Sequence, residues 1–105
     1  MATFSQIWIQ QVADEVQLEL NRLFALPGVP VPGSALDQLG LKDGAKIVRD
    51  YLAYNEAGCA FHHLLYMITE PNVCLSLENY RTLSRAGKAL GIASDEWAKV
   101  RVAKG

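Results

Sequence analysis

The sequence predicts an all-α protein, with one compact domain over residues 1–105 built from five or six helices. Apolar residues recur at three- and four-residue steps in several segments, which is the period of an amphipathic helix. Residues typical of helix starts and ends bracket these segments. No segment alternates apolar and polar residues over a strand's length, and no hairpin signal joins two apolar runs. A chain of 105 residues, half of them apolar, can bury one core without disulfides or metals.

The first helix is expected over residues 3–26. Thr3 is a good N-cap residue, because its hydroxyl can accept a hydrogen bond from the first turn. Pro27 disfavours a helical conformation in the residue before it, and Gly28 permits a sharp turn, so the helix should end there. One face carries an apolar stripe that we expect to pack on the rest of the domain, namely Ile9, Val12, Val16, Leu20 and Leu23.

Residues 27–34 (PGVPVPGS) are the linker-like segment of the chain. Three prolines in eight residues preclude a regular helix and favour a stiff, extended connection. The residues before this segment are too few to form a core of their own. We therefore expect the segment to let the first helix fold back onto the others.

Three helices are expected in the middle of the chain. Ser34 can cap a short one over residues 35–39, with Gly40 at its C′ position. Asp43 can cap a second one that runs to about Tyr54. A third should cover residues 56–69 and end before Pro71. Their inward faces are expected to carry Ile47, Val48, Tyr51, Leu52, Ala57, Ala60, Phe61, Leu64, Leu65 and Ile68.

The clearest local signal is the helix start at Ser76. Leu75 and Tyr80 have the spacing of a hydrophobic staple around that cap, and Gly91 is placed to end the helix. A last helix is expected after Ser94 and should carry Trp97 on its apolar side, with Lys104 near its end.

The sequence contains no recognisable catalytic or metal-binding motif. His62 and His63 are adjacent on a helix, so they point about 100° apart and cannot hold one ion together. Cys59 and His63 are four residues apart, but no further ligands, orienting carboxylate or oxyanion donors can be named. We therefore expect a buried cysteine and a half-buried histidine. We also expect neither enzyme activity nor a cofactor.

Charge and cysteine usage predict a soluble cytoplasmic protein. The net charge of −1 lacks the basic excess of a non-specific nucleic-acid binder. Two cysteines without a signal sequence fit reduced thiols better than a disulfide framework. The first residues, MATFSQIWIQQVADE, lack the basic start of a signal peptide, and no apolar run is long enough to cross a membrane.

Residues 47–92 resemble bacterial immunity proteins of the MafI type and similar all-helical immunity proteins (CdiI-like) from contact-dependent growth inhibition systems. The family pattern of a helix end, a polar residue, Glu, any residue and Gly is matched by Tyr51-Leu52 and Asn55-Glu56-Ala57-Gly58. A small apolar helix, an acidic residue, a link with Ser and a Tyr-bearing helix with a small-residue end follow. These elements are matched by Ala60, Leu64-Leu65, Glu70, Leu75-Ser76, Tyr80 and Gly87-Lys88-Ala89-Leu90-Gly91.

The resemblance implies an immunity protein that binds and neutralises a cognate toxin domain, most often a nuclease, by covering its active site. RNases with EndoU or RNase A folds are the first partners to try. Nuclease sites are basic because they hold phosphates, so carboxylates on the inhibitor would complement them. The expected contact residues are Asp50, Tyr54, Glu56, Tyr66 and Glu70. For both tyrosines a packing role is the alternative, and for Glu56 the alternative is a helix-start role.

Two other functions stay open from the residues alone. Arg81, Arg85 and Lys88 share one helix face, so a helical nucleic-acid-binding module would use this stripe. Alternatively, the chain is an oligomerising module in which the first helix packs against its copy, so a homo-oligomer is an expected state of the protein under that hypothesis.

Overall fold

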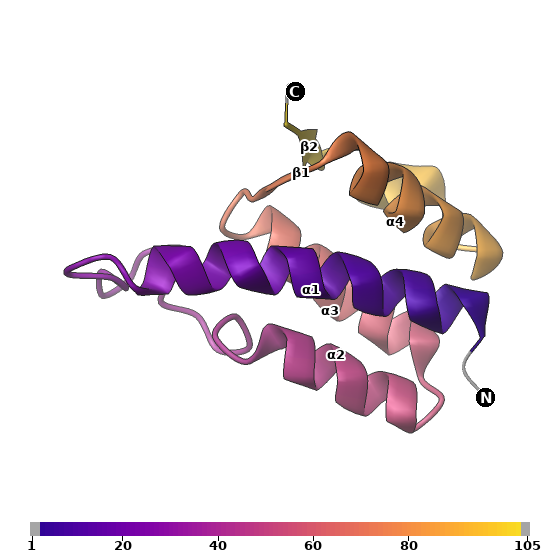
Figure 1. Ribbon diagram of the computed structural model, residues 1–105, viewed down its shortest axis with the longest axis horizontal. Coiled ribbons are helices and arrows are strands. Elements are labelled where there is room, and N and C mark those ends of the chain that lie inside the picture. Colours follow the sequence, from indigo (N-terminus) through magenta and orange to yellow (C-terminus); the bar gives the residue numbers. More distant parts are fainter. Residues whose placement is uncertain (1–2, 104–105) are drawn as a thin grey trace.

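The computed structural model describes residues 3–103 and contains four α-helices arranged in a compact globule (Figure 1). The helices are α1 (Phe4–Phe24), α2 (Gly44–Ala53), α3 (Ala57–Thr69) and α4 (Leu77–Ala89). A two-residue strand, β1 (Cys74–Leu75), pairs in parallel with β2 (Arg101–Val102), and a 3-10 helix, η1 (Ser94–Trp97), lies between α4 and β2. The all-α class is thus confirmed.

Helix α1 organises the fold, because it packs against each of the other three α-helices. It crosses the broad face of a flat molecule of 40 × 32 × 20 Å, with α4 on one side, α2 on the other and α3 behind (Figure 1). The predicted apolar stripe of α1 is buried, apart from Leu23 at its end, which is half-buried. The core is completed by α3 and α4 through Phe61, Leu64, Leu65, Met67, Ile68 and Leu83.

Two helices, α1 and α4, begin at the predicted N-cap residues Thr3 and Ser76. The Thr3 hydroxyl accepts a hydrogen bond from the N–H of Gln6, whose side chain bonds back to the Thr3 N–H and completes a capping box. The Ser76 hydroxyl accepts from the N–H of Asn79 at 3.1 Å. Asp43 precedes α2 as expected, but its side chain makes no capping hydrogen bond.

Helices α2, α3 and α4 end in the same way. Each is followed by a residue with positive φ, and two backbone N–H groups there donate back to carbonyls of the end of the helix. Asn55 and Asn72 both have φ of 60° and Gly91 has φ of 73°. After α4, the N–H of Ile92 donates to the Gly87 carbonyl at 2.9 Å and that of Gly91 to Lys88 at 3.1 Å. This pattern is a Schellman motif, which satisfies the last carbonyls of a helix. The prediction for Gly91 is therefore confirmed.

The short helix predicted over residues 35–39 is wrong, since this segment forms successive turns. The Asp37 carboxylate accepts a hydrogen bond from the Gly33 N–H at 2.8 Å, and the Gln38 amide donates to the Ala35 carbonyl at 3.1 Å. The Gln38 side chain thus occupies the Ala35 carbonyl, which a helix would pair with the Leu39 N–H. A five-residue helix also could not repay the cost of nucleation. Gly40 does take the predicted positive φ, at 86°.

The last predicted helix is also wrong, because only η1 forms there before the chain becomes extended in β2. The Ala103 N–H donates to the Leu75 carbonyl at 2.7 Å, so pairing with β1 holds this end of the chain away from a helical path. Lys104 lies outside the described residues. With this segment and residues 35–39 both non-α-helical, the described part of the chain has four α-helices instead of five or six. Within residues 3–103, no helix has the length and apolar character needed to cross a membrane.

Candidate functional site

The corner between α2 and α3 brings together three of the five residues predicted from the sequence. Asp50 and Tyr54 are four residues apart at the end of α2, and Glu56 precedes α3. The αL conformation of Asn55 makes the corner tight, and the Glu56 N–H closes it by donating to the Tyr51 carbonyl at 2.8 Å. This corner, defined by Asp50, Tyr54 and Glu56, is the candidate site.

The side chains at the corner are exposed. Tyr54 has 80% of its surface accessible, which is unusual for an aromatic ring. Asp50 forms an exposed ion pair with Lys46 at 3.1 Å. Glu56 occupies the N-cap position of α3, yet its side chain makes no capping hydrogen bond. The corner therefore presents one exposed aromatic ring and two exposed carboxylates, and the Glu56 side chain does not cap α3.

Tyr66 and Glu70 lie elsewhere. The Tyr66 hydroxyl donates to the Leu39 carbonyl at 2.8 Å, so this half-buried ring fastens the 31–43 loop to α3. Glu70 is exposed at the far end of α3, separated from Glu56 by about 21 Å of helix at 1.5 Å per residue. The structure therefore does not bring these two residues to the α2–α3 corner.

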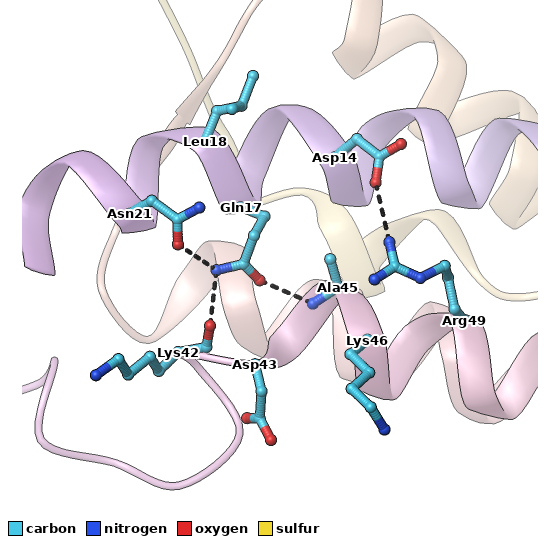
Figure 2. A pocket seen from close by; sticks show the side chains of 9 residues that line it. All are labelled: Asp14, Gln17, Leu18, Asn21, Lys42, Asp43, Ala45, Lys46 and Arg49. Carbon is cyan, nitrogen blue, oxygen red and sulfur yellow. Dashed lines mark hydrogen bonds and ion pairs between the residues drawn. The ribbon is translucent and has the colours of Figure 1, made fainter.

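A polar residue that the sequence interpretation missed joins α1 to α2 (Figure 2). The Gln17 side-chain oxygen accepts a hydrogen bond from the Ala45 N–H at 2.8 Å, while its nitrogen donates to the Lys42 carbonyl at 3.0 Å. Gln17 thus supplies to the first turn of α2 the acceptor that Asp43 does not provide. These bonds lie beside a shallow pocket of about 390 Å³. Asp14 and Arg49 in its lining form an ion pair with a distance of 3.8 Å between Oδ1 and Nη1. Its polar groups mostly bond to one another, so we assign it a structural role.

The opposite flank of α1 carries the basic stripe of α4. Arg81, Arg85 and Lys88 are all exposed, as the nucleic-acid alternative requires. Arg81 and Arg85 line a polar hollow of about 520 Å³ together with Trp8, Gln11, Leu77, Glu78 and Thr82. Because Glu78 lies among the arginines, this flank is a mixed surface instead of a purely basic one.

The histidines and cysteines form no reactive arrangement. The ring nitrogen Nε2 of His63 lies 2.9 Å from the Gly40 carbonyl oxygen, which fits the predicted half-buried histidine. Cys59 and Cys74 are both exposed free thiols, so the expectation that Cys59 is buried was wrong. Ala60 and Phe61, the next residues of α3, are buried as predicted, so Cys59 lies outside the correctly predicted inward face. In residues 3–103, no group of three or more His, Cys, Asp or Glu side chains is arranged to hold a metal ion.

One exposed ion pair lowers the pKa of a carboxyl group. The hydrogen bond that the Arg22 guanidinium donates holds the pKa of Glu19 below its usual value. Both residues lie on α1 toward its end, away from the α2–α3 corner, so this pair adds nothing to the candidate site.

Comparison with known proteins identifies no relative: no family model matches the chain, no curated protein is similar to it, and no solved structure matches its fold. Residues 3–103 by themselves define an all-α fold with four α-helices and an exposed aromatic and acidic corner. Functional assignment therefore depends on this corner and on the sequence resemblance described above.

Proposed function

We propose that this protein is a cytoplasmic immunity protein that binds a cognate bacterial toxin domain and covers its active site. The proposal builds on the resemblance of residues 47–92 to immunity proteins of the MafI type. The observation that carries it is Tyr54, an aromatic side chain that is 80% exposed and lies in the sequence between the acidic residues Asp50 and Glu56. Under this proposal the chain is a binding protein without catalysis or cofactor.

Physical chemistry supports the α2–α3 corner as a protein contact. A tyrosine offers a large apolar ring with a polar tip and little conformational entropy to lose, so exposed tyrosines are frequent anchors in interfaces. The ring of Tyr54 is close in sequence to Asp50 and Glu56, whose negative charges suit a partner with a basic cleft. A nuclease active site is basic because it binds phosphates, so a nuclease toxin, such as an RNase of the EndoU or RNase A fold, fits this corner.

The two carboxylates contribute differently in this proposal. Asp50 already pairs with Lys46, so a partner's cation must displace or share that interaction. Glu56 has no ion-pair partner among the described residues and no capping bond, so its carboxylate is available to the toxin. We therefore assign Glu56 the larger electrostatic part and Tyr54 the anchor. Glu70 would lie at the rim of the proposed toxin interface. Tyr66 has a structural role, because its hydroxyl holds the 31–43 loop against α3.

Co-production tests the proposal in cells. If a long reading frame lies immediately upstream of this gene, its C-terminal domain is the toxin candidate. Cells that make this domain should survive when they also make the present chain, and the two proteins should co-purify. Toxicity that persists at equal expression, together with the absence of any complex, would show that the chain is not an immunity protein for that toxin.

A further inference from the structure

The outward face of α1 carries large apolar side chains that no other part of the described chain covers. Phe4, Ile7 and Leu18 are 73%, 50% and 72% exposed. Together with Gln11 and Asp14 they have the 4, 7, 11, 14, 18 spacing of a helix seam. Leu18 points away from α2 (Figure 2), and α1 lies at the front of the broad face (Figure 1). We call Phe4, Ile7, Gln11 and Leu18 the α1 seam.

The α1 seam is symmetric about Gln11. Phe4 lies seven residues before it and Leu18 seven residues after it. A two-fold axis through Gln11 would therefore place Phe4 of one copy against Leu18 of the other, with the two α1 helices antiparallel, and Ile7 beside Asp14 and Glu15 of the other copy. Such an isologous contact is the commonest kind in homodimers. It also sets the two helix dipoles antiparallel, so that the N-terminus of each α1 lies near the C-terminus of the other, which is the favourable side-by-side arrangement.

The charges on α4 have the same symmetry. The Gln11 amide donates to the Asn79 side-chain oxygen at 2.9 Å, so Asn79 lies level with the proposed axis. Glu78 and Arg81 flank this level, one on each side, and both line the hollow that also contains Gln11. A two-fold axis at Gln11 would bring Glu78 of one copy opposite Arg81 of the other, and Arg81 opposite Glu78. The surface beside the seam is therefore complementary to itself.

We propose that two copies of this chain associate through their α1 seams as an antiparallel dimer with its two-fold axis at Gln11. This inference rests on the structure and does not depend on the proposed toxin. The three apolar seam residues expose roughly 300 Å² per copy for side chains of about 150–200 Å². With the usual polar rim this gives a total interface of roughly 1,000–1,200 Å². That size is at the lower limit for specific contacts, so the dimer is weak and dissociates on dilution.

The first test is the oligomeric state. Analytical ultracentrifugation over a range of chain concentrations should show a monomer that becomes a dimer as concentration rises. Leu18→Asp should weaken this association at least tenfold, because a carboxylate would replace an apolar contact on both copies. Leu39→Asp is the matched control, since Leu39 is 96% exposed and outside the seam. Circular dichroism would verify that both variants keep their helices.

A charge swap and a cross-link test the geometry. Arg81→Glu and Glu78→Arg should each weaken association, whereas the double variant should restore it, because each reversed charge then faces an opposite one. In a background of Cys59→Ser and Cys74→Ser, Gln11→Cys should form a disulfide-linked dimer under oxidation and Leu18→Cys should not. A chain that remains monomeric at every concentration would overturn the proposal. So would a Leu18→Cys dimer that forms faster than the Gln11→Cys dimer, since it would require parallel helices or a two-fold axis at Leu18 instead of Gln11.

Discussion

At the scale of single residues, a few polar side chains hold the non-helical parts of this protein in place. Gln17 bonds to the start of α2, while His63 and Tyr66 bond to carbonyls of Gly40 and Leu39 in the loop before it. Trp97 donates from its indole nitrogen to the Ser84 hydroxyl at 2.8 Å. Each bond joins residues that are distant in sequence, so its partner cannot be predicted from the neighbouring residues. These contacts were therefore missed, although the helices that carry them were predicted.

Gln17 provides a test at this scale. Replacing it with Ala should lower the free energy of unfolding by about 1–3 kcal/mol, because the part-buried Ala45 N–H would lose its acceptor. Gln10→Ala is the matched control on the same helix, since its amide bonds only to the exposed carboxylate of Asp14. We expect that change to stay within about 0.5 kcal/mol. Urea unfolding measures both values, and equal losses in the two variants would contradict the role assigned to Gln17.

At the scale of elements, the close contact of α4 with η1 depends on a glycine that sequence reasoning did not single out for this purpose. A Cβ built on Gly87 would lie 2.6 Å from the Trp97 ring atom Cη2 and 3.0 Å from Phe61. The indole cannot retreat easily, because it bonds to Ser84 and packs edge-on against Phe61 with centroids 5.8 Å apart. At Gly58 of α3, by contrast, an added Cβ would meet open space.

The two glycines give a paired prediction. Gly87→Ala should destabilise the protein by about 1–3 kcal/mol through overpacking against Trp97. Gly58→Ala should leave stability unchanged or raise it by up to about 1 kcal/mol, because Ala is the better helix former and has room. Thermal and urea unfolding of both variants would measure the difference. A stabilising Gly87→Ala change would mean that α4 and η1 are packed less tightly than described.

At the scale of the whole molecule, the spacing of apolar residues predicted the helices that bury an apolar face. It failed for the segments whose conformation is set by tertiary contacts. The stripe of α1 and the inward positions of α3 follow the helical period and are buried in one core. Residues 35–39 and the segment after Ser94 also looked helical, but side-chain bonds and pairing with β1 govern them. Only three of the five predicted contact residues lie at the α2–α3 corner, because Glu56 and Glu70 flank the same helix and therefore lie at its opposite ends, as the predicted helix over residues 56–69 already implied.

The buried face of α3 allows a direct test of the core. Leu64 is fully buried, so Leu64→Ala should cost about 2–5 kcal/mol through lost burial and the cavity left behind. Leu39→Ala, at a site that is 96% exposed, should change stability by less than about 0.5 kcal/mol. Chemical denaturation followed by circular dichroism gives both numbers. A loss below about 0.5 kcal/mol for Leu64→Ala would show that the helix face is wrongly placed.

The central claim, that the α2–α3 corner binds a toxin, is tested most directly by the affinity of purified variants for the toxin domain that the unmodified chain neutralises, measured by isothermal titration calorimetry. Tyr54→Ala and Glu56→Lys should each weaken binding by at least tenfold, since they remove the anchor and reverse the free carboxylate. Glu96→Lys, an equal charge reversal at an exposed residue of η1, should bind like the unmodified chain. Unchanged affinity in folded Tyr54→Ala and Glu56→Lys variants would contradict this claim.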